Sequence, residues 1–148
     1  MNRKEIEKVL SHREPMLLVD EIEQNGDGTV TGRYTVRGDE FFLQGHFPDD
    51  PIVPGVILCE MAAQSSCLLM ADKIKGKTTL YAGMNNVKFK NPVYPGDTVE
   101  FICAHIRSIG AFHFVRAEGR TNGKIAVSGE FSFAIVDPEK IKDKKQKN

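Results

Sequence analysis

The stretch Gly45–Ala71 decides the fold of this chain, and it reads GHFPDDPIVPGVILCEMAAQSSCLLMA. From Val56 onward nearly every side chain in it is apolar or small, which predicts a helix. Pro54 suits the start of that helix, because the missing N–H group of proline costs nothing in a first turn. A surface helix would show a polar stripe, so this helix is predicted to be buried on nearly all sides.

Two polar residues interrupt the apolar stretch and form a candidate catalytic pair. Glu60 lies within the helix, four residues before Gln64 and on the same face. A carboxylate in an apolar helix is costly unless it is paired, solvated in a cleft or protonated. His46 lies in the loop that leads into the helix. A histidine and a glutamate beside one buried helix suit general acid–base catalysis.

The start of the helix offers a third element. Its first N–H groups, including that of Gly55, have no partner within the helix and can bind a developing oxyanion. Glycine also lets a ligand approach the backbone closely. A lone loop histidine or a lone helix glutamate is more often structural, but their combination at this spacing favours a catalytic site.

The pattern G-H-F-P-x-x-P-x-x-P-G-V, followed by E-x-x-A-Q, resembles the FabZ-type (3R)-hydroxyacyl-[acyl carrier protein] dehydratases of type II fatty acid synthesis. Its residues here are Gly45–Pro48, Pro51, Pro54–Val56, Glu60, Ala63 and Gln64. Two further segments share the resemblance: His12, Arg13 and Pro15 with Leu17–Asp20, and Val87–Phe89 with Pro92, Val93 and Pro95–Asp97. Most of the chain is thus covered. Asp49 and Asp50 depart from the small or basic residues usual there, which bears on carrier docking rather than on chemistry.

The resemblance implies elimination of water from a 3-hydroxyacyl thioester. His46 is then the candidate base for the C2 proton, and Glu60 is the candidate acid for the departing hydroxyl. That role requires apolar surroundings that keep the carboxyl protonated. The Gly55 N–H is the candidate oxyanion donor, and Gln64 is expected to orient Glu60 or a water molecule. The division of roles between the histidine and the glutamate is left open, and no cofactor or metal is expected.

The resemblance also implies that two subunits share the active site, with the histidine of one facing the glutamate of the other. We therefore expect a homodimer, alone or assembled into a trimer of dimers. An apolar tunnel lined by Phe47 and the helix would hold the acyl chain, and Tyr81 would line or gate it. The expected partner is an acyl carrier protein, whose acidic surface Lys88 and Lys90 are candidates to dock.

Three alternative functions are considered. An isomerising dehydratase would also form the cis-3-enoyl thioester. FabA-type isomerising enzymes carry Asp where this chain has Glu60, although isomerising FabZ relatives keep Glu. A thioesterase could share the fold and use the helix carboxylate, but it would leave the GHFP loop unexplained. A non-catalytic acyl-binding module would be expected to lack the histidine or the glutamate.

The remaining sequence predicts an α+β protein in which about six antiparallel strands wrap the helix, the hotdog fold that the resemblance implies. A short amphipathic helix is expected over residues 2–10. Strands are expected over residues 16–23, 29–36, 79–90, 98–106, 111–118 and 124–136. A bulge is predicted near Asn85 and Asn86, and Asn122-Gly123 is a strong hairpin signal. Residues 1–137 form one predicted domain, and residues 138–148 a Lys-rich, disordered tail.

Composition excludes several classes of protein. The 148 residues carry no net formal charge, so there is no global basic surface for nucleic acid. The three cysteines are odd in number and lack a C-x-x-C pair, which argues against a disulfide framework or a zinc site. No signal sequence and no run approaching a membrane span is recognised, so a cytoplasmic protein is expected. No chemical role is assigned to the other histidines, which are His12, His105 and His113.

Overall fold

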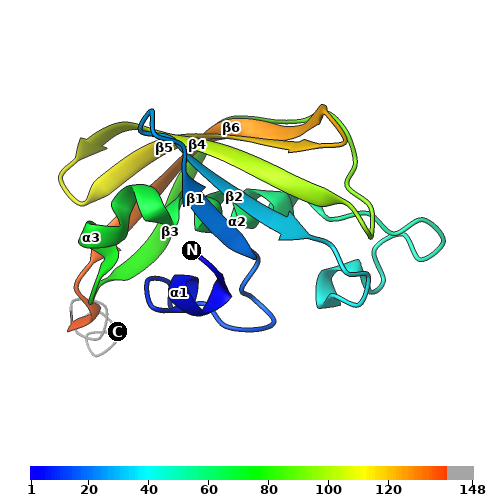
Figure 1. Ribbon diagram of the computed structural model, residues 1–148, viewed down its shortest axis with the longest axis horizontal. Coiled ribbons are helices and arrows are strands. Elements are labelled where there is room, and N and C mark those ends of the chain that lie inside the picture. The colour runs from blue at the N-terminus through cyan, green and yellow to red at the C-terminus, as the bar shows by residue number, and fades with distance from the viewer. Residues whose placement is uncertain (140–148) are drawn as a thin grey trace, which may run out of the picture.

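Stretches of alternating apolar and polar side chains form the strands of this protein. In the computed structural model, which describes residues 1–139, six strands form one antiparallel sheet in the order β1-β2-β4-β5-β6-β3. The strands are β1 (Glu21–Gln24), β2 (Val30–Thr35), β3 (Thr78–Phe89), β4 (Thr98–Ile109), β5 (Phe112–Thr121) and β6 (Lys124–Val136). The sheet arches over the helices, as Figure 1 shows, and confirms the predicted α+β hotdog fold. The predicted tail lies outside the described residues from residue 140 onward.

Local sequence signals placed the turns and the bulge correctly. Asn122 and Gly123 both adopt positive φ values, 53° and 75°, in the tight turn that joins β5 to β6. The pairing of β3 with β6 shifts between Asn85 and Lys88, and Asn86 has a φ of 53°. This bulge places one extra residue in β3 and so reverses the alternation of its side chains. Both halves of β3 remain paired with β6.

The first predicted strand, residues 16–23, is wrong over most of its length, since β1 begins only at Glu21. Leu17, Leu18 and Val19 are fully buried, but they belong to no strand. The Leu18 amide donates to the side-chain Oε1 of Gln64 at 2.7 Å. A buried apolar run thus satisfies its backbone with a distant side chain rather than with a neighbouring strand.

The predicted central helix is a helical run of three parts: α2 (Gly55–Ser65), the 3₁₀ helix η2 (Ser66–Met70) and α3 (Ala71–Ile74). It ends before Gly76, whose φ of 74° suits glycine. Gly32 of β2 packs so closely on α2 that an added Cβ would lie 2.4 Å from the Ser65 Cβ. The helix therefore sits directly against the concave face of the sheet.

The expectation that this helix is buried on all sides is only partly right. Leu58, Met61 and Ala62 are buried under the sheet, but Val56 is 73% exposed. Glu60, one turn further on, lies on the same uncovered face. The catalytic candidate of the helix is therefore on the side that faces away from the middle of the sheet, where its side chain is 21% exposed.

The expectation that no run approaches a membrane span also needs correction. Gly55–Ile74 is long and apolar enough to cross a membrane, with 20 residues and a mean hydropathy of 1.2. Half of this stretch is buried within the protein, however, as expected for the core helix that the sheet encloses. The apolar composition of this run is explained by its packing in the fold.

The N-terminal helix α1 (Arg3–Glu7) is shorter than the predicted range 2–10. It begins with a capping box, in which Asn2 and Glu5 exchange side-chain and backbone hydrogen bonds. Ile6 lies on the apolar side of this helix and is completely buried. The segment that follows, residues 8–20, runs along the open side of α2 and contributes to the site described next.

Candidate active site

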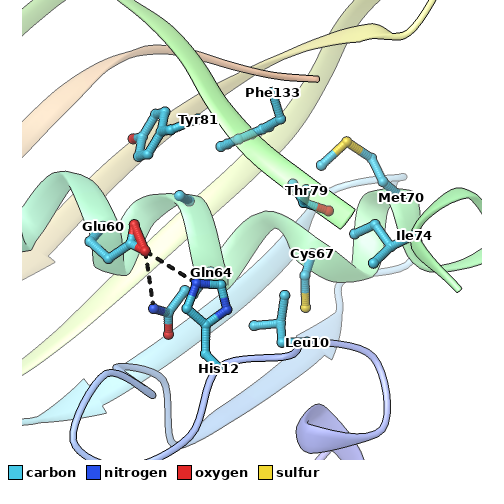
Figure 2. Close-up of a pocket in the computed structure, with 11 residues that line it drawn as sticks. Leu10, His12, Glu60, Gln64, Cys67, Met70, Ile74, Thr79, Tyr81 and Phe133 are labelled. Carbon is cyan, nitrogen blue, oxygen red and sulfur yellow. Dashed lines mark hydrogen bonds and ion pairs between the residues drawn. The ribbon is translucent and has the colours of Figure 1, made fainter. Parts of the chain in front are cut away.

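Glu60 lines a small cavity of about 70 Å³ beside α2, which Figure 2 shows. The cavity is lined by Leu10, His12, Glu60, Ala63, Gln64, Cys67, Met70, Ile74, Thr79, Tyr81 and Phe133. Most of these side chains are apolar, and the Glu60 side chain is only 21% exposed. The carboxyl predicted as the catalytic acid thus lies in an apolar recess with a few polar neighbours.

Gln64 is buried and holds the chain segment opposite the helix. Its Oε1 accepts from the Leu18 amide at 2.7 Å, and its Nε2 donates to the Met16 carbonyl at 2.8 Å. The same Nε2 lies 3.4 Å from Oε1 of Glu60. Gln64 therefore fastens the segment to α2 and contacts the carboxyl as well, in keeping with its predicted orienting role.

His12 is a site residue to which the sequence analysis assigned no role. Its Nε2 lies 3.4 Å from Oε1 of Glu60, and its side chain is 32% exposed. Figure 2 shows both His12 and Gln64 reaching the carboxyl from one side. The signal that could have found His12 is its position in the N-terminal motif H-R-x-P, 48 residues before Glu60.

Tyr81 lines the same cavity from β3. Its hydroxyl donates to the Cys59 carbonyl at 2.9 Å, and its ring packs on Phe133 with centroids 5.2 Å apart. Burial raises the pKa of the Tyr81 hydroxyl well above its usual range, and burial raises the pKa of the Cys67 thiol to about 12. Neither group ionises near neutral pH, so neither is a candidate acid or base in this cavity.

His46 lies in a second cavity, and its geometry suits a base. Its Nδ1 lies 2.9 Å from the carbonyl oxygen of Ile52. Because a carbonyl only accepts, Nδ1 must carry the proton and Nε2 of the neutral ring is free to take one. Phe47 follows with a φ of 51°, and its ring lies 4.5 Å from that of His46.

The second cavity has a volume of about 620 Å³ and joins His46 to the start of α2. It is lined by His46, Phe47, Ile52, Val53, Pro54, Gly55, Val56, Leu58, Phe89, Lys90, Asn91 and Pro92. Among the described residues no side chain caps the N-terminus of α2 by a hydrogen bond, so its first amides can serve a ligand. A Cβ at Gly55 would lie 3.0 Å from the Phe89 ring, a close contact that the exposed ring would have to relieve. Of the two candidate docking lysines, Lys90 lines this cavity and Lys88 does not.

The two cavities share no lining residue, so one chain does not bring the predicted pair together. The candidate base His46, Phe47 and the candidate oxyanion donor Gly55 line one cavity, whereas Glu60, Gln64 and Tyr81 line the other. Each cavity has half of the groups that an acid–base elimination needs.

Comparisons with known proteins agree with this chemistry. The ApeI-like family model, described as ApeI dehydratase, matches residues 21–130. The 3-hydroxyacyl-[acyl-carrier-protein] dehydratase FabZ of Clostridium perfringens is 43% identical over 137 residues, 91% of this chain and 99% of that protein. FabZ of Streptococcus equi subsp. zooepidemicus is 41% identical over 137 residues, 91% of this chain and 98% of that protein.

Solved structures give the same fold at low identity. The dehydratase heterocomplex ApeI:P from Xenorhabdus doucetiae matches with a TM-score of 0.77 and 18% identity, covering 93% of this chain and 95% of that one. A point mutant of the fluoroacetyl-CoA-specific thioesterase FlK matches with a TM-score of 0.68 and 18% identity, covering 89% and 98%. These likenesses concern the fold. The sequence identity to the curated relatives places the chain in the FabZ family of 3-hydroxyacyl-[acyl-carrier-protein] dehydratases.

Proposed function

We propose that this chain dehydrates 3-hydroxyacyl thioesters carried by an acyl carrier protein, at a site that two copies of the chain complete. The observation that carries the proposal is the separation of a prepared base and a recessed carboxyl into two cavities of one chain. Membership of the FabZ family supports the reaction, and the geometry supports the assignment of roles to individual groups.

In the proposed reaction His46 removes a proton from C2 of the acyl chain. Its Nδ1 is held by the Ile52 carbonyl, so Nε2 accepts that proton. Negative charge then develops on the thioester oxygen, where the Gly55 amide and the positive end of α2 stabilise it. Glu60 protonates the 3-hydroxyl, the C3–O bond breaks, and water and a trans-2-enoyl thioester are formed. Each acid–base group contributes about 10²–10⁴-fold to the rate.

The proposed dimer is supported by the apolar surface beside the two cavities. β3 is an edge strand of twelve residues, and edge strands of this length are normally covered. Leu80, Met84 and Phe89 on β3 are 45%, 52% and 55% exposed, and Val56 on α2 is 73% exposed. A second copy that covers this surface would bring one His46 cavity against the Glu60 of its partner and enclose an acyl tunnel between Phe47 and Tyr81.

The proposed carrier is an acyl carrier protein, as the name of the curated relatives implies. Lys90 at the edge of the His46 cavity provides positive charge for an acidic carrier. Asp49 and Asp50 are exposed and follow Phe47 closely in the chain. Their negative charges would repel an acidic carrier. We propose that the protein is cytoplasmic. We also propose that it needs no metal or cofactor, because His46, Glu60 and the Gly55 amide supply the groups for the reaction.

The decisive experiment isolates mixed dimers with two affinity tags, one chain carrying His46→Ala and the other Glu60→Gln. Each single-variant dimer should lose about 10²–10⁴-fold in kcat. The mixed dimer should recover about half of the wild-type rate, because one of its two shared sites keeps both groups. Substrate is a 3-hydroxyacyl thioester of acyl carrier protein, and products are separated by chromatography and identified by mass.

The outcomes separate the competing functions. A trans-2-enoyl thioester as the only product supports plain dehydration, an added cis-3-enoyl thioester shows an isomerising enzyme, and free acid shows a thioesterase. A mixed dimer as inactive as its parents would contradict the shared site. Sedimentation of the wild-type protein distinguishes a dimer from a trimer of dimers, and an active monomer would overturn the proposed assembly.

A further inference from the structure

The N-terminal segment that carries His12 is held rigidly against α2. Gln64 binds it at Met16 and Leu18 through both ends of its amide. The guanidinium of Arg13 donates to the carbonyls of Leu10, His12 and Glu7 at 2.9, 2.7 and 3.0 Å. These bonds fix the backbone on both sides of His12, so the residue is held beside Glu60 before any substrate binds.

The two nitrogens of this imidazole have different surroundings. Nε2 lies 3.4 Å from Oε1 of Glu60, whereas Nδ1 is buried and has no hydrogen-bond partner among the described residues. A buried N–H group without an acceptor is costly, and a buried charged one is more so. When the ring is neutral, its proton is therefore on Nε2, the nitrogen that lies 3.4 Å from the carboxyl.

Both polar neighbours of Glu60 in the cavity contact the same oxygen. The Nε2 atoms of His12 and Gln64 each lie 3.4 Å from Oε1. Oε2 is thereby left for the reacting hydroxyl. A protonated carboxyl accepts at its carbonyl oxygen and donates from the other, so two neutral donors at Oε1 orient an acid without demanding that it ionise.

From this geometry we propose that His12 is a positioning residue for the dehydration, acting as a neutral N–H donor that turns Oε2 of Glu60 toward the substrate. The proposal rests on the role given to Glu60 under the proposed function. The distance of 3.4 Å is long for a hydrogen bond, and such contacts in free enzymes commonly tighten when substrate binds. In this proposal the effect of His12 on the reaction is exerted through Glu60.

The test compares three substitutions in the full-length protein, with kcat and KM measured on a 3-hydroxyacyl thioester of acyl carrier protein. His12→Leu should lower kcat by about 10–100-fold and leave KM within about twofold, because the acid is misplaced but the acyl site is intact. His12→Gln places an amide donor near the former Nε2 and should restore most of the rate. His12→Asn places its amide near the former Nδ1 and should not.

A double variant and a control complete the design. His12→Leu combined with Glu60→Gln should be no slower than Glu60→Gln alone, since His12 acts through the carboxyl. His105→Leu is the matched control, because His105 is exposed on β4 and should leave kcat unchanged.

Each result decides the proposal. A His12→Leu variant with the wild-type kcat overturns it, as does equal loss in the Gln and Asn variants with unchanged thermal unfolding. If His12→Leu does not fold, the comparison of Gln with Asn carries the test. A Glu60→Gln variant with the wild-type kcat would instead refute the proposed function. If kcat falls in Glu60→Gln but not in His12→Leu, only the role of His12 is refuted.

Discussion

The cavity around Glu60 and the cavity around His46 are built in different ways. The first lies on a helix, holds about 70 Å³ and is closed by a segment fastened through the buried Gln64. The second is formed by a loop and the start of α2, and holds about 620 Å³. One chain thus encloses a small space around Glu60 and leaves a much larger one around His46. In the proposed dimer, the partner subunit and the substrate bring the two cavities together.

The largest effect on this comparison is expected from Gln64→Ala, which should loosen the Glu60 cavity alone. A buried main-chain amide at Leu18 and a partly buried carbonyl at Met16 would lose their partner. The free energy of unfolding should fall by about 2–4 kcal/mol, measured by urea denaturation at a fixed protein concentration. Gln44→Ala, an exposed amide near His46, is the control and should change it little. Equal stability of the two variants would contradict the fastening role.

An intermediate effect is expected from Glu40→Gln, which should loosen the start of the loop that carries His46. Burial opposes ionisation of Glu40, but hydrogen bonds from the Arg37 amide, the Tyr34 hydroxyl and the Gly38 amide outweigh it and hold its pKa below 4.5. A lowered folded pKa contributes stability above the unfolded pKa, and that stability is lost as pH falls through the folded value. At neutral pH the variant should be less stable by about 1–3 kcal/mol.

The pH dependence provides the check on Glu40. The difference in unfolding free energy between wild type and Glu40→Gln should shrink as the pH falls through the lowered folded pKa of Glu40, because the carboxyl group is protonated in both states below it. Asp39→Asn, on a side chain that is 81% exposed, is the matched control. A difference that stays constant from neutral to acidic pH would show that the charge of Glu40 does not anchor the loop.

The smallest effect on stability is expected from Gly55→Ala at the start of α2. The new Cβ would lie 3.0 Å from the Phe89 ring, which is 55% exposed and can turn aside. Unfolding should change by less than about 1 kcal/mol, whereas kcat/KM should fall about tenfold because the methyl group crowds the oxyanion donor. A double variant with Phe89→Ala should stay about as slow, because removing the ring leaves the methyl group in place. An unchanged kcat/KM in Gly55→Ala would contradict the proposed role of Gly55 as the oxyanion donor.

Much of the fold could be predicted because its signals are local. The apolar run of α2, the alternation in β6, the Asn122-Gly123 turn and the bulge near Asn86 depend on neighbouring residues alone. The segment 16–20 could not be predicted in this way. Its apolar residues satisfy a strand pattern, but a side chain 46 residues away takes the place of a strand partner at Leu18.

The site was predicted in part. His46, Glu60, Gly55 and Gln64 stood out because polar or small residues in an apolar stretch are conspicuous. His12 did not stand out, because no local sequence pattern shows that this loop histidine contacts Glu60 on α2. Its partner is known only once the segment 8–20 lies along α2, with Arg13 and Gln64 fixing its path.

The sequence by itself determined the helix with its catalytic candidates, the strand pattern and the family, because these depend on residue type and spacing along the chain. Only the tertiary structure decided that His46 and Glu60 face different cavities and that His12 and Gln64 meet one oxygen of the carboxyl. The physical reason is that distance and burial arise when the sheet closes over α2. Residues far apart in the chain then exclude water together and find their hydrogen-bond partners.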